Sequence, residues 1–187
     1  MEISLATKNK GKIREFSEIF GSAVPLLDYP EVPETGSSFI ENASLKAKTI
    51  GALMNRAVLS DDSGLLVYAL DLRPGIYSAR YGGESLSDKD RCRLILSEMK
   101  DKQDRRARFT AALALYLPSG EIIVAEGHLE GSIIFEMRGE NGFGYDSIFC
   151  PVGYTETLAE LSAEVKNQLS HRKAAAVNLL SKIEHML

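Results

Sequence analysis

Residues 3–20 read ISLATKNKGKIREFSEIF, and this stretch decides the class of fold that we expect. Ile3–Ala6 has the apolar character of a short buried strand, whereas the apolar residues from Ile13 to Phe20 recur at the three- and four-residue steps of a helix. A polar turn separates the two. The spacing therefore predicts a strand, a turn and a helix that begins near Gly11.

The same alternation continues along the chain. We expect a strand from Ala23 to Leu27, a Pro/Gly/Ser loop, and then a long helix that turns Glu41 and Lys48 outward. The residues expected on the buried face of this helix are Phe39, Ala43, Ala47, Ile50 and Met54. A strand over 57–60 follows, and the turn-forming residues 61–64 are expected to end it.

The second half of the chain predicts a helix over roughly 87–100 and a hairpin of longer strands over 107–134. Residues 138–153 are too rich in glycine for a helix, and a closing helix carries Val177, Leu180 and Ile183. Helices that alternate with strands, together with a hairpin, predict an α/β fold with a mixed sheet flanked by helices. No linker stands out, so we expect a single domain over 1–187 with two lobes that share the sheet.

Composition excludes several classes of function. The chain has 187 residues and a formal net charge of −4, which disfavours a broad nucleic-acid surface but suits a small anionic ligand. The N-terminus lacks the apolar core of a signal peptide, and no apolar run approaches the roughly 20 residues that span a bilayer. We expect a soluble, cytoplasmic protein whose two cysteines, Cys92 and Cys150, are buried thiols.

Two motifs in the first third of the chain point to phosphate chemistry. A loop between strand and helix presents free N–H groups and the positive end of a helix dipole, which favour phosphate, although a solvated lysine turn remains an alternative. Asp61-Asp62-Ser63-Gly64 places carboxylates at a strand end, where with Glu41 they could hold magnesium or activate water. The alternatives are that residues 61–64 only form a turn and that Glu41 only provides a negative charge at the N-terminus of its helix.

Two further motifs suit a flat, polar ligand. Phe143-Gly144-Tyr145-Asp146 lies in a glycine-rich segment whose backbone can approach a ligand closely, and the Phe143 ring could stack on a base. The alternative is an ordinary loop whose aromatic residues belong to the core. On one straight helix, Lys166 and Arg172 lie about 120° apart, so they could grip opposite sides of a ligand or decorate the surface.

Together these blocks resemble the inosine triphosphate pyrophosphatase family, which hydrolyses non-standard purine nucleoside triphosphates. The matching segments run from residue 6 to residue 176 and are ATKNKGKIREF, SFIENASLKAK, LSDDSGLLV, PGIYSARYGG, GENGFGYDSIF and AEVKNQLSHRKAA. One departure is Ser147, where the family usually has proline. The resemblance implies an elongated mixed α/β fold, an active-site cleft between two lobes, and a homodimer.

The resemblance also implies roles for individual residues. Asp62 would be the proton acceptor, and Glu41 with Asp62 would bind Mg²⁺. The remaining substrate contacts would come from a triphosphate loop, a neighbouring serine and a base and sugar pocket. These are Thr7, Lys8, Asn9, Lys10, Gly11 and Lys12 in the loop, Ser63, and Phe143, Gly144, Tyr145, Asp146, Lys166, His171 and Arg172 in the pocket.

The expected reaction is attack of water on the α-phosphorus of inosine, deoxyinosine or xanthosine triphosphate, which releases pyrophosphate and a monophosphate. Donors such as Lys166 and Arg172 would favour a purine with a carbonyl at its six-position over adenine. Two alternatives stay open from the residues: a Maf-like pyrophosphatase of other nucleotides, and a nucleotide sensor without turnover. An RNA-binding module is the weakest of the candidates.

Overall fold

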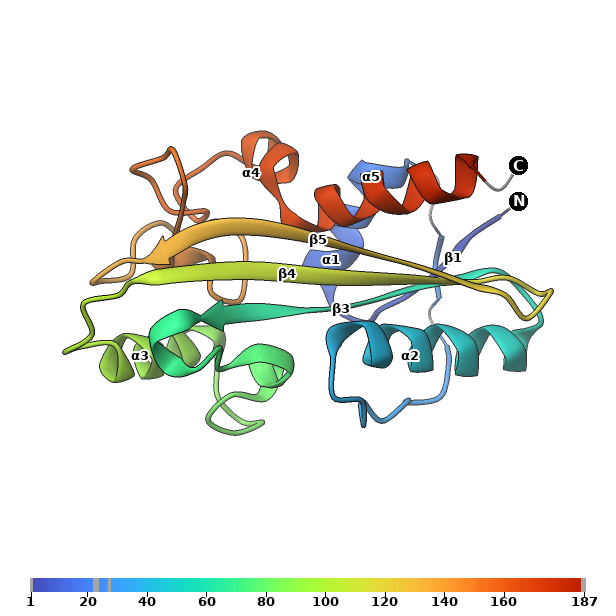
Figure 1. Cartoon of the computed structure of the whole chain (residues 1–187), viewed down its shortest axis with the longest axis horizontal. Coiled ribbons are helices and arrows are strands. Elements are labelled where there is room, and N and C mark those ends of the chain that lie inside the picture. The colour runs from blue at the N-terminus through green and yellow to red at the C-terminus, as the bar shows by residue number, and fades with distance from the viewer. Residues whose placement is uncertain (1, 22–23, 27, 186–187) are drawn as a thin grey trace. The chain divides into compact units, whose positions relative to one another are not determined.

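A computed structural model describes residues 2–21, 24–26 and 28–185 (Figure 1). Its strands form a six-stranded sheet in the order β2-β1-β3-β4-β5-β6. The strands are β1 (Ser4–Ala6), β2 (Val24–Pro25), β3 (Val58–Val67), β4 (Arg106–Tyr116), β5 (Ile122–Ile133) and β6 (Phe149–Pro151). β1 pairs in parallel with β2 and β3, whereas β5 and β6 are antiparallel, so the predicted mixed sheet is confirmed.

Helices cover the sheet on both faces. The α-helices are α1 (Lys10–Phe20), α2 (Phe39–Met54), α3 (Asp88–Glu98), α4 (Ala163–Leu169) and α5 (His171–Glu184). Three 3-10 helices accompany them, η1 (Tyr68–Leu70), η2 (Gly75–Arg80) and η3 (Asp146–Ile148). The predicted α/β class and most of the predicted helices are therefore confirmed. Of the strand expected over 23–27, Ala23 and Leu27 lie outside the described residues.

The chain folds into two compact units. Unit 1 comprises Met1–Ser63, Ala111–Gly127 and His171–Leu187, and unit 2 comprises Gly64–Thr110 and His128–Ser170. β3, β4 and β5 each contribute residues to both units. That the units act as two lobes of a single domain stays a prediction.

Unit 1 packs α1 and α5 on one face of its strands and α2 on the other (Figure 1). Leu5 and Leu59 join the cluster with Phe16 of α1 and Leu179 of α5. The residues that flank them along the strands, such as Val58, pack with α2 instead. Side chains alternate between the two faces of a strand, so a few short strands can support helices on both.

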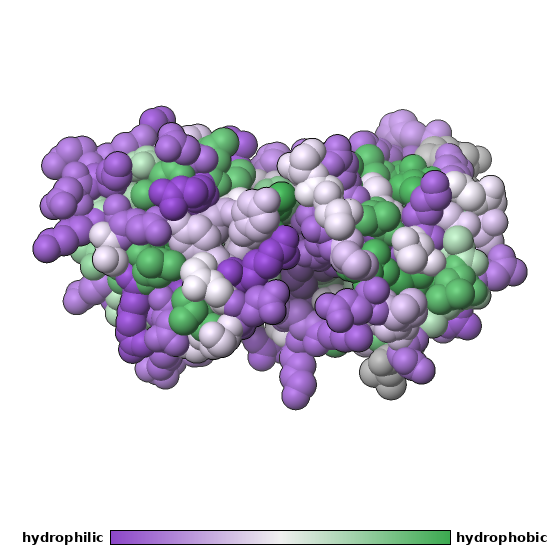
Figure 2. Space-filling model, turned by 90° about the horizontal axis from the view of Figure 1, so that it is seen from below, coloured by the Kyte–Doolittle hydropathy of each residue, from purple (hydrophilic) through white to green (hydrophobic). Residues whose placement is uncertain are grey.

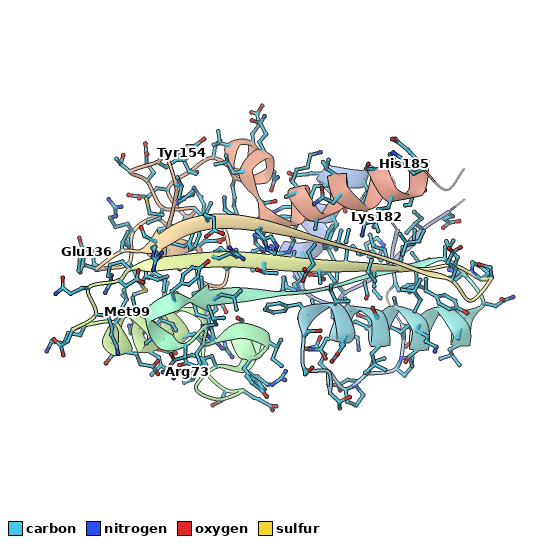
Figure 3. The ribbon with its side chains drawn as sticks, viewed as in Figure 1. Arg73, Met99, Glu136, Tyr154, Lys182 and His185 are labelled. Carbon is cyan, nitrogen blue, oxygen red and sulfur yellow. The ribbon has the colours of Figure 1, made fainter. Side chains whose placement is uncertain are left out.

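Unit 2 is built around a second core. Its buried side chains include Ile95 of α3, Met99 at the C-cap of that helix, Phe109 of β4 and Phe149 of β6. The rings of Phe109 and Phe149 lie 4.7 Å apart between centroids. At the surface, Arg73, which is labelled in Figure 3, donates to Tyr81 Oη at 2.7 Å and lies 3.2 Å from the carboxylate of Glu98.

Two sequence-based predictions of local structure are wrong. The expected turn at 61–64 is the middle of β3, which continues to Val67. The preference of Asp, Ser and Gly for turns is local, and pairing in the sheet overrides it here. The single helix expected to carry both Lys166 and Arg172 is interrupted at Ser170, whose backbone is extended with ψ at 145°.

The predicted closing helix is confirmed. Ala175, Ala176 and Leu179 are buried and Ile183 packs against the same core, whereas Val177 and Leu180 are exposed. On the opposite side of unit 1, Figure 2 shows hydrophobic residues gathered over the part of the surface where α2 lies. Leu45 and Leu53 of α2 are among the exposed large hydrophobic residues.

Both cysteines are buried and free, as predicted. No helix among the described residues is both long and apolar enough to cross a membrane.

Candidate active site

The predicted triphosphate loop follows β1 in unit 1. Thr7 Oγ1 accepts a hydrogen bond from Asn9 N at 3.2 Å, and Asn9 Oδ1 accepts one from Lys12 N at 3.1 Å. Asn9 is therefore the N-cap of α1, and Lys12 lies in the first turn of the helix. The ammonium of Lys8 lies over the Tyr29 ring, 5.0 Å from its centre.

The sheet register places this loop beside the aspartates. β1 and β3 are parallel, and Ala6 is opposite Ser60. Thr7 directly follows the end of β1, and Asp61 is the next residue within β3, which continues to Val67, so the two residues lie side by side. In open α/β sheets, ligands bind at the carboxyl ends of parallel strands, and the end of β1 offers such a position.

Asp61 is fully buried and lies among cations. Lys12 Nζ is 2.7 Å from its Oδ2, and Arg172 Nε is 3.8 Å from the same atom. Lys46 Nζ donates to its carbonyl oxygen at 3.0 Å. Burial raises the pKa of Asp61, but Lys12, Arg172 and Lys46 outweigh burial, so the net pKa is lowered. Asp61 is therefore a permanent anion that organises the cations around it.

Asp62 has the opposite surroundings. It is 5% exposed, and its carboxylate accepts hydrogen bonds from Asn42 Nδ2 and from Ser63 N, both at 2.9 Å. Burial and the negative charge of Glu34 raise its pKa to about 6, although Lys12 and Asn42 act against this. A carboxylate with such a pKa can accept a proton near neutral pH.

The sequence analysis missed two residues of this cluster, Lys46 and Glu34. Lys46 Nζ lies 2.9 Å from Glu34 Oε1, and the Lys46 side chain is only 15% exposed. Lys46 follows Asn42 by four residues on α2, so both point from the same face of the helix. The only sequence signal for Lys46 was its spacing of four residues from Asn42 on a predicted helix, and the loop position of Glu34 gave no signal.

Glu41, the predicted metal ligand, forms hydrogen bonds with a neighbouring residue, and its role as a ligand stays a prediction. Its carboxylate accepts hydrogen bonds from Ser37 N at 2.7 Å and Ser37 Oγ at 2.9 Å, and these bonds lower its pKa. It lies in the first turn of α2, whose N-cap is Ser38. In the described part of the chain, no three His, Cys, Asp or Glu residues are grouped so that they could hold a metal ion by themselves.

Arg172 and Ser63 extend the cluster in unit 1. Arg172 NH1 donates to Glu15 Oε2 at 2.8 Å, and its NH2 donates to Ser63 Oγ at 2.9 Å. Glu15 is a third residue that the sequence analysis missed, although it lies in the quoted KIREF segment. His171 is buried beside Arg172 at the start of α5.

The predicted base pocket belongs to unit 2. Lys166 Nζ donates to Asp146 Oδ2 at 2.6 Å and lies 4.7 Å from the centre of the Phe143 ring. Asp146 Oδ2 also accepts a hydrogen bond from Phe143 N at 2.8 Å. A side chain at Gly142 would run into the Asp146 carboxylate, so glycine is required there. Phe143, Asp146 and Lys166 thus form one cluster.

Tyr145 has a structural role through its side chain. The ring is part of the core of unit 2, and the hydroxyl donates to the Ser78 carbonyl oxygen at 2.8 Å. Burial raises the pKa of this hydroxyl. Of the two alternatives open for the aromatics of this motif, the core one holds for Tyr145.

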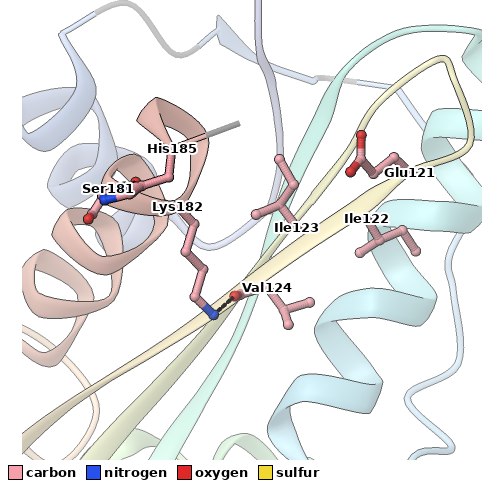
Figure 4. A pocket seen from close by; sticks show the side chains of 7 residues that line it. All are labelled: Glu121, Ile122, Ile123, Val124, Ser181, Lys182 and His185. Atoms are coloured by element: carbon pink, nitrogen blue, oxygen red, sulfur yellow. Dashed lines mark hydrogen bonds between the residues drawn. The ribbon is translucent and has the colours of Figure 1, made fainter. Parts of the chain in front are cut away.

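One pocket lies apart from these residues, within unit 1 between β5 and α5 (Figure 4). Its volume is about 550 Å³, and Lys182 Nζ crosses it to donate to the Val124 carbonyl oxygen at 2.7 Å. The lining residues are Glu121, Ile122, Ile123, Val124, Ser181, Lys182 and His185. None of the predicted site residues lines it, so we assign it no part in the chemistry.

The chain is similar to known proteins over its whole length. The chain is 48% identical to a dITP/XTP pyrophosphatase of Oceanobacillus iheyensis over 100% of its length and 99% of the relative, and 44% identical to one of Bacillus subtilis over 97% and 96%. The solved Ham1 protein of Staphylococcus aureus has a TM-score of 0.89 at 41% identity, with both chains fully covered. The model of the Ham1 family matches residues 3–182. The chain therefore belongs to the Ham1 family.

Proposed function

We propose that this protein hydrolyses dITP, XTP and ITP to the nucleoside monophosphate and pyrophosphate, and so removes non-standard purines from the nucleotide pool. The names of the relatives support the substrate class. The observation that carries the proposal is Asp62, a buried carboxylate with a pKa of about 6, beside three cations that surround Asp61.

In this proposal Asp62 accepts the proton of the water that attacks the α-phosphorus. Asn42 and Ser63 N hold the carboxylate in one orientation, which is the main requirement for a positioned base. Lys12 and the N-terminus of α1 stabilise the negative charge on the leaving pyrophosphate. Asp61 and Glu15 keep Lys12 and Arg172 in place, because each forms an ion pair with one of them.

The donors of this site suit Mg²⁺. Mg²⁺ is usually held by one or two carboxylates together with substrate phosphates, so a cluster of three protein ligands is not needed. Asp61 Oδ1 is buried and accepts no hydrogen bond from the described residues. The negative charges of Glu34 and Asp61 act on Asp62, so a cation beside Asp62 would be attracted by several carboxylates. We propose Glu41 and Asp62 as the protein ligands, with Glu34 as a further carboxylate whose charge acts on Asp62. Bound there, Mg²⁺ would neutralise charge on the phosphate oxygens.

We assign recognition of the base to the residues of unit 2. Phe143 offers a ring face, and Lys166 offers N–H donors for a carbonyl at the six-position of the purine. Adenine presents an amino group at that position, which is itself a donor. In a closed site the amino group and the donors of the protein would both lack hydrogen-bond partners, and this lowers the affinity for adenine. The contacts of Arg172 with Glu15, Ser63 and Asp61 favour a role on the phosphate side rather than at the base.

Product analysis tests the proposal. With Mg²⁺ and dITP, the wild-type protein should release pyrophosphate and dIMP, and dATP should react far more slowly. Asp62→Asn should lower kcat by at least about 10²-fold, because it removes the proton acceptor. The matched change Asp101→Asn, at an exposed turn residue, should leave the rate intact.

Three results would contradict the proposal. Orthophosphate as the first product would mean that a different bond breaks. Binding of dITP without turnover would favour a sensor, and a preference for pyrimidine nucleotides would favour a Maf-like activity. We also propose a homodimer in the cytoplasm, which light scattering and fractionation can test.

A further inference from the structure

The loop that carries Phe143 and Asp146 depends on unusual backbone geometry. Gly142 and Gly144 both have positive φ, at +77° and +61°. Within the loop, Asp146 accepts from Phe143 N, and Asp146 N donates back to the Phe143 carbonyl oxygen at 3.3 Å. These bonds close the turn between Phe143 and Asp146, but they do not involve the N–H or the carbonyl of Gly144.

Helix α3 binds both of those groups. Asp88 Oδ2 accepts the hydrogen bond of Gly144 N at 2.8 Å, and Cys92 Sγ donates to the Gly144 carbonyl oxygen at 3.4 Å. Asp88 and Cys92 are four residues apart, so they lie on one face of the helix, one above the other. The peptide groups on the two sides of Gly144 are thus held by two successive turns of α3.

The helix that makes these contacts is firmly anchored in unit 2. Ser87 and Asp90 form a capping box at its start, and Ile95 and Met99 are fully buried in the core. Cys92 itself is 1% exposed. A rigid helix can therefore fix the position of this loop.

Ser147 adds a third contact, at the position where the family usually has proline. Its hydroxyl donates to Cys92 Sγ at 3.6 Å. Proline has no such donor, so in this chain the departure links the far end of the loop to the same cysteine. Serine at 147 thus supplements the contacts of Asp88 and Cys92.

We propose that Asp88 and Cys92 are positioning residues for recognition of the base. By holding Gly144, they keep Phe143 and Asp146 in the arrangement that the purine binds. This inference rests on the proposed function of the unit 2 cluster. If the contacts are lost, the loop samples other conformations, and the apparent affinity falls in proportion to the competent fraction.

Asp88 also contributes to the electrostatics of α3, and the test must separate this effect from the contact with Gly144. It lies in the first turn of α3, where a negative charge favours the helix dipole, and its Oδ1 is 3.5 Å from Arg91 NH1. Asp88→Asn removes this charge but keeps an oxygen that can accept from Gly144 N. Asp88→Ala removes both. The two variants lose the same helix electrostatics and differ in the loop contact.

Steady-state kinetics with dITP is the first measurement. Asp88→Ala should raise KM about tenfold while kcat stays within about twofold, and Asp88→Asn should stay close to wild type. Cys92→Ala should raise KM less, because a thiol is a weak donor. Inorganic tripolyphosphate, which lacks a base, should inhibit all four proteins equally. Equal KM values for Asp88→Ala and Asp88→Asn, or a wild-type KM for Asp88→Ala, would overturn the inference.

Hydrogen exchange of the Gly144 amide is the second measurement, and it does not depend on activity. The amide should be protected in wild type and in Asp88→Asn, and its exchange should speed up at least about tenfold in Asp88→Ala. Unchanged protection in Asp88→Ala would refute the contact itself. If the wild-type protein fails to hydrolyse dITP, the proposed function fails, whereas this measurement still decides whether Asp88 holds the loop.

Discussion

At the scale of single residues, Asp61 and Asp62 are neighbours in sequence with opposite electrostatic surroundings. Three cations keep the pKa of Asp61 low against the effect of burial, while burial and Glu34 raise the pKa of Asp62 to about 6. Along a strand, successive side chains point to opposite faces, so adjacent residues can meet different neighbours. One carboxylate thereby stays charged, and the other is suited to exchange a proton.

The raised pKa of Asp62 predicts a pH-dependent stability difference from Asp62→Asn. Between about pH 4 and pH 6 the folded protein holds a proton on Asp62 that the unfolded chain has lost, so the wild type loses stability as pH rises. A shift from 3.8 to about 6 corresponds to roughly 3 kcal/mol. Relative to Asp62→Asn, the free energy of unfolding of the wild type should fall by up to that amount.

Urea denaturation of both proteins from about pH 4 to pH 8, in EDTA to exclude metal binding, measures this difference. Other acidic groups titrate in both proteins and cancel in the comparison. A difference that does not change with pH would show that Asp62 titrates normally.

The choice between Glu34 and Glu41 gives a prediction about metal. The negative charge of Glu34 acts on Asp62, whereas Glu41 caps α2 through Ser37. Glu41→Gln should raise the Mg²⁺ concentration for half-maximal rate by about tenfold or more, because a carboxylate ligand is lost. Glu34→Gln should leave that concentration much closer to the wild-type value. A Mg²⁺ titration of the rate in both variants decides, and the reverse result would assign the ligand to Glu34.

At the scale of elements, close contact between β5 and α5 positions the start of the helix. A Cβ at Gly127 would lie against backbone atoms of His171 and Ala175, which cannot move as a flexible side chain could. Gly127→Ala should therefore push the first turn of α5 away and displace Arg172. We expect a loss of about 1–3 kcal/mol in unfolding free energy.

The same variant should lose activity at temperatures where it remains folded, because Arg172 contacts Ser63 and Glu15. Circular dichroism melting and dITP turnover at a temperature well below the transition measure the two effects. Full activity in a destabilised variant would show that the first turn of α5 can shift without cost to the site.

The helices and strands were predicted from the sequence more reliably than the contacts between them. Periodicity identified the helix at Gly11 and the strands around it, because those patterns are local. The turn expected at 61–64 failed because pairing with neighbouring strands decided the backbone there. The break at Ser170 and the role of Glu34 depend on contacts between distant segments, which the local pattern does not contain.

At the scale of the whole molecule, the charge is unevenly distributed. The net charge is −4, yet Lys12, Lys46 and Arg172 converge on Asp61 in unit 1. An acidic protein repels polyanions, whereas cations held in place at a site can still contact a small anion. This distribution favours a nucleotide over a nucleic acid as the ligand.

Ligand-induced stabilisation of the Asp62→Asn protein tests this at the level of the molecule, because slow turnover leaves the nucleotide intact. A ligand at about 100 times its Kd adds roughly 2.7 kcal/mol to the unfolding free energy. For a chain of this size, that corresponds to a rise in Tm of about 5–10 °C. Mg²⁺ with dITP or XTP should give this rise, tripolyphosphate a smaller one, and dATP little beyond that of tripolyphosphate. Equal shifts with dITP and dATP would show that the unit 2 cluster does not select the base. The absence of any shift with tripolyphosphate would show that the cations around Asp61 do not bind phosphate.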